Sequence, residues 1–161
     1  MKRVYLILVL MVVVSAALAD DKPKAQGQDA REGIEAWVAA VLAGKVDEAN
    51  ALTDPGEKDF DKVAKEFKDW LGVGSLKIPT VYVSEKQGRA VAVSEAVKFT
   101  KRPPGADDPN PEVLFFKLVK VKDKWLLKKI EFYAEAGAKK HVERFRTSHP
   151  DAKELPPKSK E

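Results

Sequence analysis

The sequence predicts an α+β domain in which a strongly curved antiparallel sheet is wrapped over helices that precede it, with an extra helix at the C-terminus. Two observations carry this prediction. Residues 112–133 (EVLFFKLVKVKDKWLLKKIEFY) place apolar side chains with a period of two on either side of a turn at Lys122-Asp123-Lys124, which is typical of a β-hairpin. Residues 29–71 instead repeat their apolar side chains with a period near 3.6, which indicates amphipathic helices.

The first 28 residues are expected to lie outside this domain. Lys2 and Arg3, an apolar run over 4–14 and Ala-Leu-Ala before Asp20 form the pattern of a secretory signal peptide, so residues 1–19 are predicted to be cleaved after Ala19. The protein would then be exported, to a periplasm or outside the cell. The apolar run is shorter than the roughly 20 residues that cross a bilayer, so an uncleaved anchor is the lesser alternative. Residues 20–28 read as a flexible leader.

Charge and composition exclude several classes of function. Lysine and arginine number 29 against 25 acidic residues, and two of the cations belong to the predicted signal peptide, so the mature chain is only mildly basic and nucleic acid is not an expected partner. The chain has no cysteine and only His141 and His149, which excludes the common zinc sites. Phosphate-loop, dinucleotide-binding and serine-hydrolase motifs do not occur. No cofactor or metal is therefore expected.

Three helices are predicted at the start of the domain, which spans 29–147. The first begins at Asp29, paired with Glu32 as in a capping box, and ends at Gly44. Its apolar face is formed by Ile34, Trp37, Val38, Val41 and Leu42. Shorter second and third helices are expected over 46–53 and 59–71.

Strands follow because the apolar period changes to two after residue 74. They are expected over 78–84 and 89–100, with a proline-rich loop at 101–111 before the hairpin. In the second of these strands Ala90, Ala92, Ser94 and Ala96 form a small-residue face that would let another layer approach closely. Strict alternation in the last strand of the hairpin sets Trp125 and Leu127 against Leu126, Ile130 and Phe132. A terminal helix is predicted over 134–147, and a disordered tail over 148–161.

The order of these elements resembles the nuclear transport factor 2-like superfamily, which includes SnoaL-like and ketosteroid-isomerase-like proteins. The stretches that carry the resemblance are 36–52 (AWVAAVLAGKVDEANAL) and 119–130 (VKVKDKWLLKKI), and the element order extends it over 29–133. Lys45 departs from the pattern, because an acidic residue usually follows the glycine. The resemblance implies a cystatin-like cone, with a pocket between the helices and the sheet.

The resemblance also implies where chemistry would lie. Enzymes of the superfamily place carboxylates and a tyrosine in the cone, but the first helix here has Trp37 and no tyrosine, which argues against isomerase chemistry. Glu95 is the candidate catalytic carboxylate, because it shares a strand face with Val93 and Val97 and would be desolvated in a cone. The alternative is that Glu95 points outward or pairs with a lysine of the neighbouring strand. Glu131 poses the same question.

The function predicted from these patterns is that of an exported, non-catalytic domain with a cone-shaped pocket for a small apolar ligand, or for self-association. The residues expected to line that pocket are Trp37, Phe67, Trp70, Tyr82, Glu95, Phe116 and Trp125, unless the aromatic side chains only form the core. A homodimer would use the sheet face that carries Phe115, Val119 and Val121. The alternatives are a small cofactor-free isomerase, hydrolase or cyclase, and a binder of anionic lipid or polymer through the lysine-rich hairpin.

Overall fold

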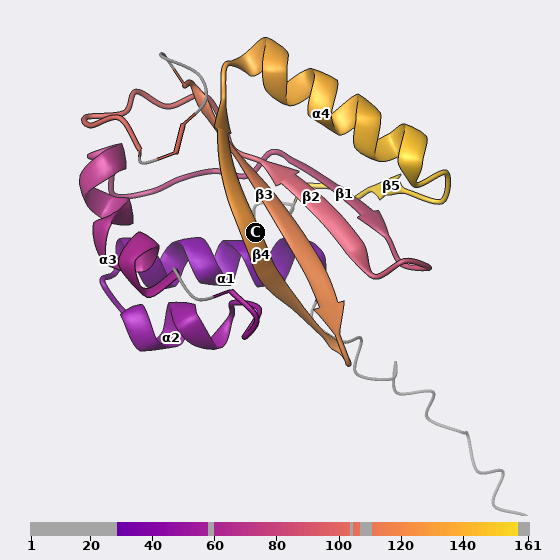
Figure 1. The fold of residues 1–161 in the computed structure, drawn as a ribbon, viewed down its shortest axis with the longest axis horizontal. Coiled ribbons are helices and arrows are strands. Elements are labelled where there is room, and N and C mark those ends of the chain that lie inside the picture. Colours follow the sequence, from indigo (N-terminus) through magenta and orange to yellow (C-terminus); the bar gives the residue numbers. More distant parts are fainter. Residues whose placement is uncertain (1–28, 58–59, 104, 107–110, 158–161) are drawn as a thin grey trace, which may run out of the picture.

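The structure is a computed structural model that describes residues 29–57, 60–103, 105–106 and 111–157. The predicted signal peptide and leader lie outside these residues. The elements in chain order are α1 (Ala30–Leu42), α2 (Val46–Ala51), α3 (Phe60–Leu71), β1 (Thr80–Ser84), β2 (Arg89–Val93), β3 (Val113–Val121), β4 (Lys124–Tyr133), α4 (Glu135–Ser148) and β5 (Lys153–Glu154). The strands form one antiparallel sheet in the order β4-β3-β2-β1-β5 (Figure 1). The α+β class is therefore confirmed.

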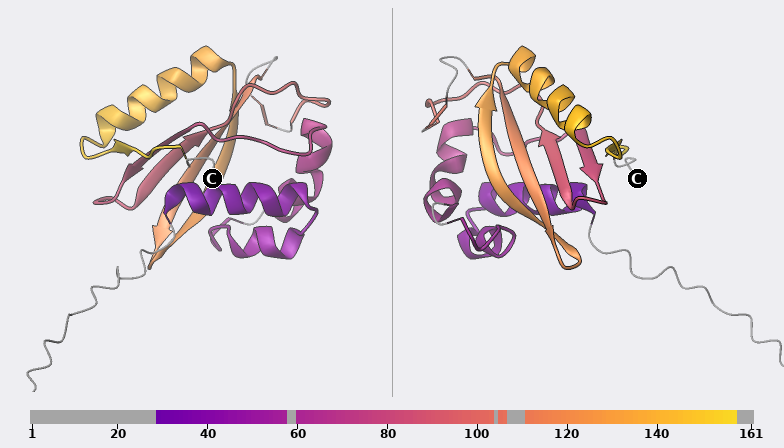
Figure 2. Two further views of the ribbon diagram at one scale, coloured as in Figure 1. Left: turned by 180° about the vertical axis from the view of Figure 1, so that it is seen from behind. Right: turned by 45° about the vertical axis from the view of Figure 1, so that its right-hand side comes forward.

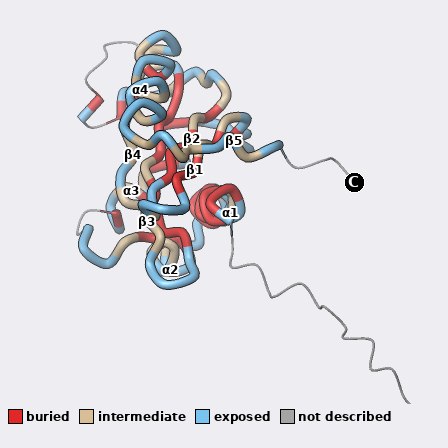
Figure 3. Tube along the Cα trace, turned by 90° about the vertical axis from the view of Figure 1, so that its right-hand side faces the viewer, coloured by how far each residue is buried: buried red, intermediate tan, exposed pale blue. Residues whose placement is uncertain are grey.

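Helices lie on both faces of the sheet. The helices α1, α2 and α3 are on one face, and α4 crosses the other (Figures 1 and 2). The larger core lies between α1, α3 and the sheet, and α1 is buried along most of its length (Figure 3). A second apolar cluster joins Val91 and Phe115 of the sheet to Ala138, Val142 and Phe145 of α4.

The predicted cone is not confirmed. The sheet is open and twisted rather than closed over the helices (Figure 2). The prediction took apolar side chains on both strand faces as a sign of strong curvature. The strands are apolar on both faces because helices cover both faces. The helix α4 buries Val91 and Phe115 on the outer face, and α1 buries Ala90 and Phe116 on the inner face.

The contact between α1 and the sheet is close, as the small-residue face of β2 predicted. Ala90 and Ala92 lie in the core that α1 covers. A Cβ atom at Gly33 of α1 would meet the backbone oxygen of Trp125 at 2.9 Å, so only glycine fits at this point of the interface. Trp37 and Trp125 are 0% and 1% exposed.

A β-bulge in β4 overturns the predicted alternation of that strand. Lys117 pairs with Lys129 while Leu118 pairs with Leu127, so Lys128 is an extra residue in the ladder. Trp125, Leu127, Ile130 and Phe132 consequently all contact the inner core. The backbone of Leu127 is bonded on its other edge, where its N–H donates to Leu52 at 2.9 Å and its carbonyl accepts from the N–H of Asp54 at 2.8 Å.

The strand predicted over 89–100 is shorter than expected. The ladder of β2 ends at Val93, and the chain then makes isolated backbone bonds to the segments on both sides, such as the N–H of Glu95 to the carbonyl of Lys77 at 2.9 Å and the N–H of Val97 to the carbonyl of Glu112 at 2.7 Å. The start of α1 agrees with the sequence, because the Asp29 side chain accepts from the N–H of Glu32 at 2.8 Å.

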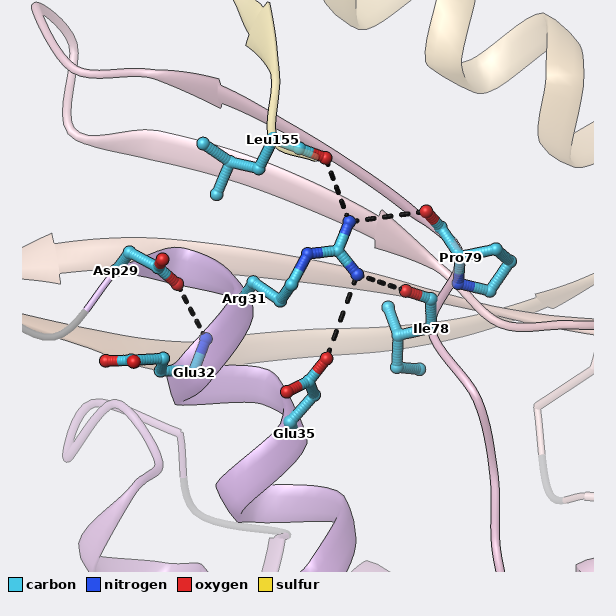
Figure 4. Close-up of polar contacts among 7 residues, drawn as sticks. All are labelled: Asp29, Arg31, Glu32, Glu35, Ile78, Pro79 and Leu155. Atoms are coloured by element: carbon cyan, nitrogen blue, oxygen red, sulfur yellow. Dashed lines mark hydrogen bonds and ion pairs between the residues drawn. The ribbon is translucent and has the colours of Figure 1, made fainter. Parts of the chain in front are cut away.

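The C-terminal segment differs from the predicted disordered tail in its described part. Lys153 and Glu154 pair with Val83 and Tyr82 of β1, and Leu155 packs against the inner core. Arg31 of α1 holds this segment through hydrogen bonds, and its side chain is buried, with 3% of its surface exposed. Its guanidinium donates to the carbonyls of Leu155 at 3.0 Å and Pro79 at 3.3 Å and also to that of Ile78 (Figure 4).

Candidate functional site

Four residues of the predicted pocket fill the core instead of lining a cavity. Trp37, Phe67, Phe116 and Trp125 are each at most 1% exposed. The rings of Trp37 and Phe67 meet edge to face with their centroids 5.1 Å apart. These side chains occupy the space between the helices and the sheet in which a ligand was expected. They are core residues, which was the alternative interpretation. Trp70 belongs to the same core and borders a cleft beside α3.

Glu95 is not a lone buried acid. Its carboxylate accepts a hydrogen bond from the backbone N–H of Lys77 at 3.2 Å and lies 4.0 Å from the Lys77 ammonium, and its side chain is 40% exposed. Glu95 therefore pairs with a lysine, as the alternative interpretation expected, and that lysine lies three residues before β1. Tyr82 lies nearby and donates to Glu154 at 2.8 Å. Both border a groove on the β1 side of α4 that is rimmed by Glu135, Glu143 and Glu154.

The better candidate site lies on the other side of α4, between that helix and strands β2, β3 and β4. We call this cavity the α4 cleft, and its volume is about 450 Å³. Its charged lining consists of Arg89, Lys117, Lys128, Glu131 and Arg144. Its aromatic lining consists of Phe115, Tyr133, His141, Phe145 and His149.

Glu131 is the carboxylate of this cleft, and three donors hold it. The Lys117 ammonium lies 2.8 Å and the Lys129 ammonium 2.9 Å from its Oε1 atom, and the Tyr133 hydroxyl donates to Oε2 at 2.8 Å. Burial by itself raises the pKa of Glu131, but the hydrogen bonds from Lys117, Lys129 and Tyr133 outweigh it and lower the pKa from 4.5 to about 2. A carboxylate fixed in this way stays ionised and is a poor general base.

The strand register explains why Glu131 is needed there. Lys117 and Lys129 lie directly opposite each other in the β3–β4 ladder, where like charges repel. Glu131 shares its Oε1 atom between the two ammonium groups and so offsets that repulsion. The bulge at Lys128 is required for this arrangement, because a regular ladder of the same sequence would pair Lys117 with Lys128 and turn Glu131 to the inner core.

Stacked rings form the apolar wall of the cleft. His141 stacks on Tyr133 with centroids 4.2 Å apart, and His149 stacks on Phe145 at 4.1 Å. Phe115 meets the rings of Tyr133 and His141 edge to face, each at 5.8 Å. Burial lowers the pKa of His141, although the nearby charge of Glu131 opposes this shift. His141 is therefore held toward its neutral form.

Sequence reasoning missed most of this site. Its α4 residues could have been found from their spacing, because His141, Arg144, Phe145 and Ser148 follow one helical face. The strand residues could not be aligned with them, because the bulge reverses which β4 side chains face outward. Among the described residues no group of three or more histidine, cysteine or acidic side chains could hold a metal ion.

Comparison with known proteins does not establish a family. No family model matches the chain, and no curated protein sequence does. A solved structure that it matches is the solution structure of a SEC-C motif-containing protein from Rhodopseudomonas palustris. The identity is 18%, the match covers 60% of this chain and 72% of that one, and the TM-score is 0.43. Nothing about function is argued from a likeness at this level.

The resemblance to the nuclear transport factor 2-like superfamily is wrong. The structural match is to a SEC-C motif protein, and neither a family model nor a curated sequence supports the superfamily. The physical reason is that a helix–glycine–helix stretch and a lysine-rich hairpin with a central tryptophan satisfy general requirements of capping and sheet packing. Such features are therefore not specific to one superfamily.

Proposed function

We propose that this protein is an exported, non-catalytic domain that binds a small organic molecule in the α4 cleft. The observation that carries the proposal is the cavity itself, which has a wall of stacked aromatic rings and polar groups at its rim. Small-molecule sites combine these two features. The geometry gives no support to the alternative of a cofactor-free enzyme, because three donors hold Glu131 in its ionised form and Glu95 is paired at the surface.

Self-association through the outer sheet face is less well supported by the packing. Phe115 was expected to contribute to such an interface, but α4 covers it and leaves it 1% exposed. Only Val121 of the three expected residues is exposed, at 39%. One exposed valine is a small apolar contribution for a stable interface.

A fluorescent probe and one matched pair of variants test the proposal. N-phenyl-1-naphthylamine, an uncharged aromatic amine, should bind the full protein saturably, with its fluorescence excited outside the tryptophan band. Ser148→Trp should weaken this binding at least about tenfold, because Ser148 lines the α4 cleft and the indole would occupy it.

Thr147→Trp is the control for the helix itself. Thr147 and Ser148 are both exposed and each donates its hydroxyl to the backbone carbonyl four residues earlier, at 3.0 and 2.9 Å. Thr147 does not line the α4 cleft, so its replacement should leave probe binding unchanged. Failure of the unchanged protein to bind the probe, or equal binding by Ser148→Trp, would overturn the proposal.

A further inference from the structure

We infer that the ligand of the α4 cleft is an organic anion, a compact apolar molecule that carries one carboxylate, sulfonate or phosphate group. This inference rests on the proposed binding function. Four cations and one carboxylate line the cleft, so its lining has a net charge of +3 with the histidines neutral. The groove on the opposite side of α4 is lined by four glutamates and one lysine, Lys139, so the excess of positive charge is specific to one side of the helix.

The carboxylate of the cleft leaves most of that positive charge unbalanced. Glu131 already accepts from Lys117 and from Lys129. Arg89, Lys128 and Arg144 form no ion pair with any carboxylate in the part of the chain that the structure describes. A small anion in the cleft would supply the missing counter-charge, and hydrogen bonds from charged donors are the strong ones.

The cations converge from both walls of the cavity. Arg89 pairs with Val119 in the β2–β3 ladder, which makes it a diagonal neighbour of Lys117 on the outer face. Lys128 reaches the cleft from the bulge of β4, and Arg144 reaches it from α4. A solvated surface would spread such charges apart, whereas here four separate elements of the fold direct them to one cavity.

The position of the anion within the cleft follows from the end of α4. The C-terminus of a helix carries partial negative charge, which repels anions within its last turn. His149 lies against this end, with its Nδ1 atom 2.8 Å from the carbonyl oxygen of Phe145. The anionic group should therefore lie toward Arg89 and Lys128 on the strand side. The apolar body would then lie against the stacked rings.

Two probes of nearly the same shape test the inference. 8-anilinonaphthalene-1-sulfonate has the ring system of N-phenyl-1-naphthylamine and one added sulfonate. The protein should bind the sulfonate probe at least about tenfold more tightly than the neutral one. This preference should shrink when the ionic strength is raised, while binding of the neutral probe should not weaken, because salt screens only the charged contact.

A matched set of variants separates the cleft from net charge. The double variant Lys128→Gln/Arg144→Gln should remove the preference for the sulfonate and change binding of the neutral probe by less than about twofold. The control Lys124→Gln/Lys140→Gln also removes one cation from β4 and one from α4, both outside the lining, and should keep the preference. Circular dichroism establishes that each variant is folded.

The outcomes distinguish the two proposals. If the neutral probe binds but the sulfonate binds no more tightly, the ligand-binding function stands and the inference of an anion is wrong. An equal loss in both double variants would also overturn the inference, since net charge alone would then explain it. Vesicles of phosphatidylglycerol are the remaining probe. If vesicles bind in a way that depends on Lys128 and Arg144 and the soluble sulfonate does not bind, these cations contact a lipid surface. That result would overturn the inference that the ligand is a small organic anion.

Discussion

Glu131 shows how one side chain determines the electrostatics of a cleft. It neutralises two opposed lysines and accepts from Tyr133, so it removes a repulsion and orients an aromatic wall at once. Its side chain is 15% exposed, so its ion pairs are less screened than those at the surface. The residue acts through its neighbours and leaves Arg89, Lys128 and Arg144 as the cations available for binding.

The pKa of Glu131 predicts how its contribution depends on pH. Because the folded-state pKa is lowered from 4.5 to about 2, the stabilisation is complete above about pH 4.5 and is lost as the pH falls toward 2. We expect Glu131→Gln to lower the free energy of unfolding by up to about 3 kcal/mol at pH 7. At pH 2.5 the difference should be much smaller. Urea denaturation at the two pH values measures both.

Glu85→Gln is the matched control for this prediction. Glu85 also pairs with a lysine of β3, since its carboxylate lies 2.7 Å from the Lys120 ammonium, but its side chain is 62% exposed. Such surface pairs contribute at most about 1 kcal/mol. A loss in Glu131→Gln that is the same at pH 2.5 as at pH 7 would show that the effect comes from packing and not from the charge.

At the scale of the elements, the bulge of β4 decides what each face of the sheet presents. It lets Trp125 and Leu127 before it, and Ile130 and Phe132 after it, contact the same inner core. It also turns Lys129 and Glu131 outward, opposite Lys117 and Phe115. One inserted residue thus completes the core and the candidate site together.

Deleting Lys128 should therefore leave the fold intact. The deletion makes Leu127 and Lys129 neighbours, so the pairs Leu118–Leu127 and Lys117–Lys129 follow each other in a regular ladder, and Ile130 and Glu131 keep their faces. We expect a loss of less than about 2 kcal/mol. Deleting Lys129 as well would shift the strand by one residue, turn Ile130 outward and Glu131 toward the core, and should cost more than about 4 kcal/mol. Thermal unfolding followed by near-ultraviolet circular dichroism compares the two variants, and a single-deletion variant that does not fold would contradict the role of Lys128 as the extra residue.

Arg31 allows a second prediction at this scale. Arg31→Met keeps an aliphatic stem but leaves the carbonyls of Ile78 and Leu155 without this donor, which should cost about 1–3 kcal/mol. The segment around β5 should loosen first. Hydrogen exchange of the Leu155 amide, which donates to the carbonyl of Val81 at 2.8 Å, should become faster. Arg144→Met removes an exposed arginine of α4 as a control, and unchanged protection of Leu155 in Arg31→Met would contradict the prediction.

Local signals were sufficient for the elements but not for the site. The cap at Asp29 and the helix end at Gly44 with its φ of 73° depend on near neighbours in sequence, and the sequence predicted both. The bulge has no such signal. Nothing in the sequence at Lys128-Lys129 marks an extra residue. The bulge becomes visible only when β4 is paired with β3, where Lys117 lies opposite Lys129. Arg31 was missed because its partners lie 47 to 124 residues away.

At the scale of the whole molecule, α4 divides the outer face of the sheet into two regions of opposite charge. The α4 cleft is basic, and the groove beside β1 is rimmed by Glu95, Glu135, Glu143 and Glu154. Arg146 of α4 lies over the ring of Tyr82 at 5.3 Å and so ties the helix to β1. No helix among the described residues is long and apolar enough to cross a membrane.

The predicted export concerns residues outside this fold. Lys2 and Arg3, the apolar run and Ala17-Leu18-Ala19 lead us to expect that the natively expressed protein begins at Asp20. Mass spectrometry of the intact mature protein measures its N-terminus. Replacing Ala19 with a bulky residue should block cleavage, because the processing site accepts small side chains. A chain that starts at Met1 and is recovered with the membrane fraction would contradict the prediction.

The anchoring of α4 at both ends has a consequence for how a ligand would arrive. Before the helix, the N–H of Glu135 donates to the Glu112 carboxylate at 3.1 Å, and after it Ser84 donates to Asp151 at 2.8 Å. The cavity is therefore preorganised, and a ligand need not order the helix in order to bind. Association should proceed in one kinetic phase, because no conformational step has to precede or follow binding. Affinity for different ligands would then be set by how slowly each one leaves.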